Sequence, residues 1–126
     1  MTRRALQPEG IATPSLPYSP VVVSGDHVFT AGQVAHDSTG SLVSGGIVEQ
    51  TRQTLANVRA CLREAGCDLE DVVKITAFLA DLGDVAGYNE VYREHFAAPY
   101  PARTTVQAGL PDEILVEIEA VARIPS

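Results

Sequence analysis

The chain has 126 residues, a length typical of one domain, and 45% of them are hydrophobic, which is enough to form a buried core. Its formal net charge of −7 opposes non-specific binding to nucleic acid or to anionic membranes. No apolar run approaches the roughly 20 residues that a membrane span needs. We therefore expect a single domain over residues 1–126 that binds neither nucleic acid nor membrane.

The cysteines and histidines form no pattern that predicts a cofactor site. Cys61 and Cys67 do not make a CxxC pair, so we expect free thiols in a cytoplasmic protein. The histidines are scattered and have no metal-binding spacing, so we predict no metal site. There is no glycine-rich phosphate-binding motif and no nucleophile elbow, so neither a bound cofactor nor a covalent mechanism is expected.

The N-terminal part predicts an irregular arm followed by a hairpin. Residues 1–16 form the arm, with room for one short strand, and the prolines on either side of Tyr18 hold the chain extended. Strands are predicted at Val21–Val23 and Val28–Val34, joined by a turn rich in turn-forming residues. Gly32 within the second strand indicates a bulge or a close approach of the backbone to another group.

The middle of the chain predicts two helices around a strand. Apolar residues at alternating three- and four-residue steps predict a helix over Ile47–Ala65, and Gly66 can adopt the left-handed conformation that closes it. Val72–Leu79 is largely apolar on both faces, which is typical of a strand covered on both sides. A second helix within Asp81–Phe96 carries Asn89 on its apolar stripe, and that amide either is hydrogen-bonded in the core or lines a cavity.

Two further strands complete the chain. The first begins at Arg103 and continues to Ala108, and a turn at Leu110–Glu113 separates it from the last strand. Side chains of the last strand alternate, so its small and aliphatic residues point one way while Glu117 and Glu119 point the other.

The order of these elements determines the fold class. The order β-β-α-β-α-β-β predicts an α+β fold in which two helices pack on one face of a single mixed sheet. The other face of the sheet is too apolar to remain in water, so we infer an oligomer whose sheets turn inward.

Arg103 and the acid pair Glu117 and Glu119 are the candidate functional residues. The two acids share one face of a strand, where burial would raise the pKa of one of them. Arg103, expected on a neighbouring strand, either forms a structural salt bridge with an acid or binds the carboxylate of a ligand through its planar guanidinium. In the second case a nearby glutamate would orient or deprotonate a water molecule.

Several separated segments, in the same order, resemble the RidA (YjgF) family of small trimeric enamine/imine deaminases. These segments are TAGQV, QTRQTLANV, VVKITAFLADLGDVAGYNEVYREHF and PARTTVQAGLP…VEIEAVA. The resemblance covers nearly the whole chain. It implies a chorismate-mutase-like α+β fold and a homotrimer, with sheets inward and ligand sites at the subunit interfaces.

The resemblance also implies two catalytic residues. Arg103 matches the arginine that binds the substrate carboxylate, and Glu117 matches the glutamate that positions the hydrolytic water. Glu119 is then a structural neighbour. The loop between Arg103 and Glu117 looks one residue shorter than in common members of the family.

Five further residues match substrate-binding positions of the family. Tyr18 matches an aromatic residue that covers the pocket from an adjoining subunit, although from the sequence alone it could equally be a packed surface ring. Ala31 and Gly32 fall where backbone groups line the pocket, and Asn89 matches an asparagine on the second helix. Thr105 takes the position where many members have cysteine, which is thought to contribute chiefly its backbone.

The implied reaction is hydrolysis of 2-iminobutanoate or 2-iminopropanoate, formed from enamines such as 2-aminoacrylate, to a 2-keto acid and ammonia without a cofactor. Such imines hydrolyse unaided, so acid–base assistance of roughly 10²–10⁴-fold would suffice. Three alternatives stay open. One is a deaminase of 3-aminoacrylate or of a pathway-specific imine, and another is a ligand-binding or chaperone-like trimer with little turnover. The third, a ribonuclease, is disfavoured by the net charge of −7.

Overall fold

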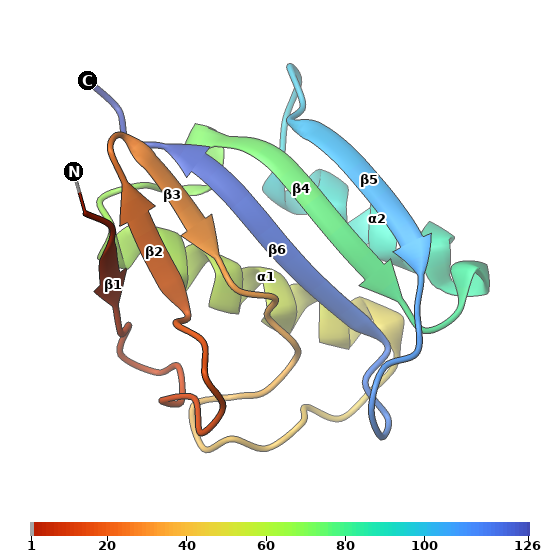
Figure 1. The fold of residues 1–126 in the computed structure, drawn as a ribbon. Helices are drawn as coiled ribbons and strands as arrows, with labels where there is room; N and C mark the ends of the chain where they lie inside the picture. Colours follow the sequence, from red (N-terminus) through yellow and green to blue (C-terminus); the bar gives the residue numbers. More distant parts are fainter. Residues whose placement is uncertain (1) are drawn as a thin grey trace.

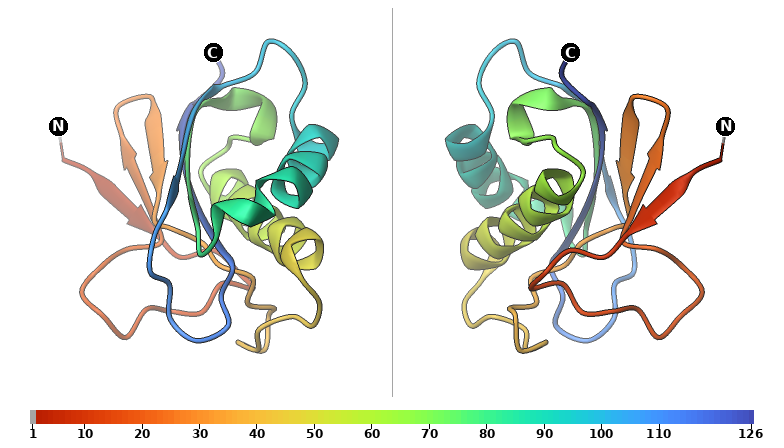
Figure 2. Two further views of the ribbon diagram at one scale, coloured as in Figure 1. Left: turned by 90° about the vertical axis from the view of Figure 1, so that its right-hand side faces the viewer. Right: turned by 90° about the vertical axis from the view of Figure 1, so that its left-hand side faces the viewer.

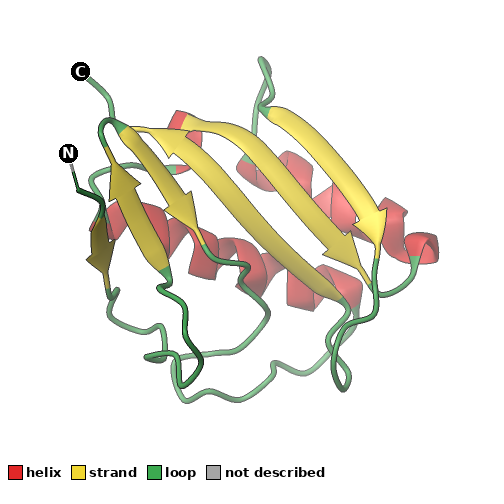
Figure 3. Cartoon of the chain, in the orientation of Figure 1, coloured by secondary structure: helices red, strands yellow, loops and turns green. Residues whose placement is uncertain are grey.

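The computed structural model describes residues 2–126, and its strands and helices form two layers (Figures 1 and 3). Met1, the first residue of the predicted arm, lies outside the described residues. The strands are β1 (Arg4–Leu6), β2 (Val21–Ser24), β3 (His27–Thr30), β4 (Val72–Leu79), β5 (Ala102–Gln107) and β6 (Val116–Arg123). The helices are α1 (Ile47–Glu64) and α2 (Val85–His95), with short 3₁₀ turns at Leu69–Asp71 and Leu82–Asp84.

The six strands form one mixed sheet in the order β1-β2-β3-β6-β4-β5. Only β4 and β5 are parallel, and the crossover between them contains α2, while the other neighbours are antiparallel. Both helices lie against the same face of the sheet, as the two side views in Figure 2 show. The predicted α+β class, with two helices on one face of a mixed sheet, is therefore confirmed.

The helix-covered face of the sheet holds the core. Leu55, Val58 and Leu62 of α1 are fully buried together with Ile75 of β4 and Ile118 of β6. The expected helix Ile47–Ala65 is confirmed to within one residue, and Gly66 follows it with a φ of +83°, which a glycine adopts without strain. None of the helices in residues 2–126 is both long and apolar enough to cross a membrane.

Two buried amides on α1 fix loops near the sheet. The Gln50 side chain donates to the Glu113 carbonyl at 2.9 Å and accepts from the Leu115 amide at 2.9 Å, so it holds the turn before β6. The Asn57 amide donates to the carbonyls of Val34 and His36, both at 2.8 Å. Sequence periodicity predicts only the apolar part of this helix face, whereas Gln50 fixes the turn before β6 and Asn57 fixes the loop after β3.

The second strand of the hairpin is shorter than predicted. It ends at Thr30 instead of Val34, because the chain leaves the ladder at Ala31 and Gly32. Pairing resumes at Gln33, whose amide donates to the Ile118 carbonyl at 2.8 Å and whose carbonyl accepts from the Ile118 amide at 3.0 Å. The predicted irregularity at Gly32 is thus confirmed, and it leaves both backbone groups of Gly32 outside the ladder.

The face of the sheet opposite the helices carries apolar side chains. Phe29 and Val106 are 43% and 39% exposed, and Phe78 and Val121 beside them are half-buried. This surface is the apolar face expected from the sequence. That a second and a third copy cover it stays a prediction.

Candidate functional site

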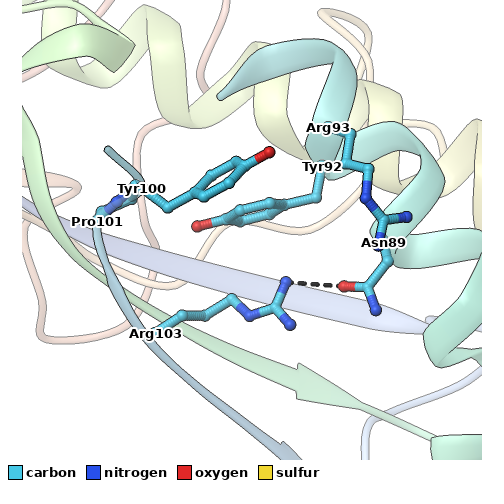
Figure 4. A pocket seen from close by; sticks show the side chains of 6 residues that line it. All are labelled: Asn89, Tyr92, Arg93, Tyr100, Pro101 and Arg103. Atoms are coloured by element: carbon cyan, nitrogen blue, oxygen red, sulfur yellow. Dashed lines mark hydrogen bonds between the residues drawn. The ribbon is translucent and has the colours of Figure 1, made fainter. Parts of the chain in front are cut away.

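Arg103 lies on the edge strand β5 and points to the helix-covered side of the sheet. It pairs in register with Ile75, whose side chain is buried beneath the helices. Its Nη1 donates to the Asn89 side-chain oxygen of α2 at 2.7 Å (Figure 4). Its guanidinium carbon is 5.3 Å from the ring centre of Tyr88 and 4.8 Å from that of Tyr92. One hydrogen bond and two aromatic faces therefore hold the guanidinium in place.

A cavity of about 290 Å³ opens beside this guanidinium. It is lined by Asn89, Tyr92, Arg93, Tyr100, Pro101 and Arg103 (Figure 4). Within residues 2–126 Arg103 forms no ion pair, so most of its donors face the cavity or solvent. A planar cation with free donors is suited to bind a carboxylate.

Sequence reasoning missed several residues that line this cavity. Tyr92, Arg93, Tyr100 and Pro101 were not singled out as candidate site residues. The position of Tyr100 and Pro101, directly before the strand that carries the candidate residue Arg103, was the available signal. Burial raises the pKa of the Tyr92 hydroxyl to about 12, so it is a neutral donor.

Thr105 lies on the same side of the sheet as Arg103. It pairs with the buried Ala77, and its hydroxyl oxygen is buried with no hydrogen-bond partner among the described residues. Asn89, Arg103 and Thr105 therefore form one set of predicted site residues, which we call the arginine group.

Glu117 lies on the opposite face of the sheet, close to Gly32. It pairs with Phe78, and its side chain packs directly over the Gly32 backbone. A Cβ at position 32 would lie 2.9 Å from Cδ and 3.0 Å from Cγ of Glu117 and would press on its carboxylate. Burial, and then the negative charge of Glu119, raise the pKa of Glu117 above its ordinary value. A carboxylate with a raised pKa is a stronger base than an ordinary glutamate.

Tyr18 and Ala31 lie near Gly32. Tyr18 is 55% exposed, and it lines a second hollow, of about 120 Å³, together with Gly32. The Ala31 amide donates to the Pro20 carbonyl at 2.9 Å, which ties the Tyr18 segment to the end of β3. Tyr18, Ala31, Gly32 and Glu117 form the second set of predicted site residues, which we call the glutamate group.

The expectation that Arg103 and Glu117 lie on neighbouring strands is wrong. The crossover through α2 places β5 at the edge of the sheet, and β4 lies between β5 and β6. In addition, the two side chains project from opposite faces. Within residues 2–126 Arg103 pairs with neither Glu117 nor Glu119, so the alternative of a structural salt bridge within the chain is also wrong.

Metal ligands and reactive thiols are not found at either group. No cluster of three or more His, Cys, Asp or Glu residues that could hold a metal ion occurs in the part of the chain that the structure describes. Cys61 and Cys67 are free and buried, as expected, and burial raises the pKa of Cys61 to about 12. Neither thiol is therefore available as a nucleophile in the folded protein.

The fold and the arginine-lined cavity define a small α+β protein suited to bind an anionic ligand. The model of the family described as Endoribonuclease L-PSP matches residues 10–124. The chain belongs to this family, which is the RidA (YjgF) family that its sequence resembles.

Relatives cover most of the chain. A RutC family protein of Pyrococcus abyssi is 44% identical over 124 residues, which are 97% of this chain and 98% of the relative. The human 2-iminobutanoate/2-iminopropanoate deaminase is 44% identical over 108 residues, 84% of this chain and 79% of the relative. The crystal structure of TdcF from E. coli with bound serine superposes with a TM-score of 0.87 at 35% identity, covering 98% and 99% of the two chains.

Proposed function

We propose that the protein is a 2-imino acid deaminase that hydrolyses imines such as 2-iminobutanoate and 2-iminopropanoate to 2-keto acids and ammonia. The observation that carries the proposal is the Arg103 guanidinium, free of any ion pair within the described residues and held at the wall of a small cavity. The deaminase name of the human relative and the serine bound to TdcF, an amino acid with a carboxylate, support the proposal.

In the proposed reaction Arg103 binds the substrate carboxylate and leaves the C=N carbon open to water. Glu117 takes a proton from the attacking water as its oxygen bonds to that carbon, and the C=N bond becomes a C–N single bond. That proton is passed to the nitrogen, which gives a carbinolamine. Glu117 then transfers the hydroxyl proton of the carbinolamine to the amine nitrogen, the C–N bond breaks as the C=O bond forms, and ammonia and the 2-keto acid leave. The raised pKa of Glu117 suits this exchange, because the group both accepts and returns a proton.

The two groups would have to meet across an interface between copies of the chain. They project from opposite faces of one sheet, so Arg103 and Glu117 of the same copy do not converge. Arg103 lies on the edge strand β5, so a neighbouring copy at this edge, with the apolar faces that carry Phe29 and Val106 turned inward, would bring its glutamate group toward the arginine group of the first. We therefore extend the proposal to a homotrimer with sites between its subunits.

The test is keto-acid release from 2-aminoacrylate generated in solution, with the wild type compared with Arg103→Ala. The proposal predicts faster release with the wild type only, while size-exclusion chromatography shows the same oligomer for both proteins. Equal rates with and without wild-type protein would overturn the deaminase proposal. A variant that lost its oligomeric state would instead give Arg103 a structural role.

A further inference from the structure

The cavity beside Arg103 contains a second guanidinium, which the proposed reaction does not use. Arg93 lies four residues after Asn89 on α2, so both side chains project from the same side of the helix. Arg93 and Arg103 both line the cavity. In Figure 4 the Asn89 amide lies between their guanidinium groups, and the rings of Tyr92 and Tyr100 form another part of the wall.

The two arginines that line the cavity differ from most other arginines of the chain. Arg52, Arg59, Arg63 and Arg123 each form an ion pair with a carboxylate. Within residues 2–126 neither Arg93 nor Arg103 does so. In a protein with a net charge of −7, two unpaired guanidinium groups at one small cavity make it a local site for anions.

A substrate with one carboxylate engages only one of these cations. Arg103 is fixed by Asn89 and by the tyrosine rings, whereas the Arg93 side chain forms no hydrogen bond or ion pair within residues 2–126 and can turn toward a second anionic group. The cavity of about 290 Å³ is near the lower limit of ligand pockets, roughly 300 Å³, so a compact diacid suits it better than an extended ligand.

From this arrangement we infer that the site favours 2-imino acids whose side chain ends in a second carboxylate, with Arg93 as the specificity-determining residue. The inference rests on the proposed deaminase function. Arg103 holds the carboxylate next to the C=N carbon, and Arg93 holds the distal carboxylate. The chemistry is unchanged, because water adds to the imine carbon and ammonia leaves, which gives a 2-keto dicarboxylate.

The experiment compares two imines made in solution by oxidation of the corresponding amino acids, one monocarboxylic (from 2-aminobutanoate) and one dicarboxylic (from glutamate). Initial rates give kcat and KM for the wild type, Arg93→Gln and Arg93→Lys. Arg63→Gln is the matched control, because it removes the same charge from a helix surface away from the cavity. Circular dichroism verifies that each variant is folded.

We expect Arg93→Gln to raise KM for the dicarboxylic imine about 10-fold, the order of one charge-assisted hydrogen bond, and to raise KM for the monocarboxylic imine much less. Arg93→Lys should recover part of the loss, and Arg63→Gln should match the wild type. Equal effects of Arg93→Gln on both imines would overturn the inference and leave the deaminase proposal intact.

If the protein accelerates neither imine, the deaminase function fails and the ligand inference is tested by binding alone. Calorimetry with 2-oxoglutarate and 2-oxobutanoate then measures affinity. Tighter binding of 2-oxoglutarate, lost in Arg93→Gln but not in Arg63→Gln, would support a site for two carboxylates. Equal binding of the two acids by the wild type would overturn it.

Discussion

Replacement of Gly32 by alanine tests whether the position of the Glu117 carboxylate matters for turnover. The added Cβ would lie 2.9 Å from Cδ and 3.0 Å from Cγ of Glu117, and still closer to a carboxylate oxygen. The crowded atoms belong to a half-buried, flexible side chain, so the carboxylate can swing aside while the backbone stays in place. The substitution therefore displaces one functional group without removing it.

The expected effects on stability and on rate differ in size. Overpacking costs about 1–3 kcal/mol where the surroundings are rigid, and loss of glycine entropy in the unfolded state offsets about 0.4–1 kcal/mol of this. Because the side chain of Glu117 can move, we expect a net loss of about 1 kcal/mol or less, or a Tm lower by about 3–6 °C at most. A displacement of about 1 Å at a reacting group can lower kcat about 100-fold.

The assay is kcat for 2-iminobutanoate hydrolysis, together with thermal unfolding followed by circular dichroism. Gly109→Ala is the matched control, because a Cβ there meets nothing within 4 Å. If Gly32 acts only through Glu117, Gly32→Ala should add little to the loss already caused by Glu117→Gln. Full activity of Gly32→Ala, or equal losses in Gly32→Ala and Gly109→Ala, would refute the reasoning.

Three further predictions follow from the same contacts. Tyr92→Leu removes the ring whose centre lies 4.8 Å from the Arg103 guanidinium carbon, so KM should rise about 2- to 10-fold. Tyr92→Phe keeps a ring there, so its KM should stay near that of the wild type. The base must be deprotonated, so kcat/KM should fall as the pH drops through the raised pKa of Glu117, above the ordinary 4.5. Glu119→Gln removes the nearby negative charge, which is the smaller of the two causes that raise the pKa of Glu117. The fall of kcat/KM at low pH should therefore shift to lower pH, but burial should keep it above the position of an ordinary glutamate. Burial should protect Cys61 and Cys67 from alkylation at pH 8 until urea unfolds the protein, and rapid labelling of the native protein would contradict their placement in the core.

The fold was largely predictable because its elements carry strong local patterns. Periodicity and Gly66 define α1 almost to the residue, and alternation in the last strand separates Val116 and Ile118 from Glu117. The early end of β3 was not predictable in its bounds. Gln33 returns to the ladder beside Ile118, and only the tertiary position of β6 determines this pairing.

The arrangement of the predicted site residues could not be derived from the sequence. The pattern around Arg103 and Glu117 indicated a carboxylate site, but sequence order does not reveal that β6 inserts between β3 and β4. For the same reason the sequence left open a salt bridge of Arg103 with an acid of the last strand, which the structure does not contain within residues 2–126. Arg103 instead donates to Asn89, on the helix that precedes β5 in the chain.

The measurement that tests the central claim most directly is mixing of two inactive variants, Arg103→Ala and Glu117→Gln. After joint unfolding and refolding of equal amounts, a site formed between two copies receives an intact Arg103 and an intact Glu117 in about one case in four. The account predicts recovery of about a quarter of the wild-type deaminase activity. A mixture no more active than the two separate variants would contradict a site shared between subunits.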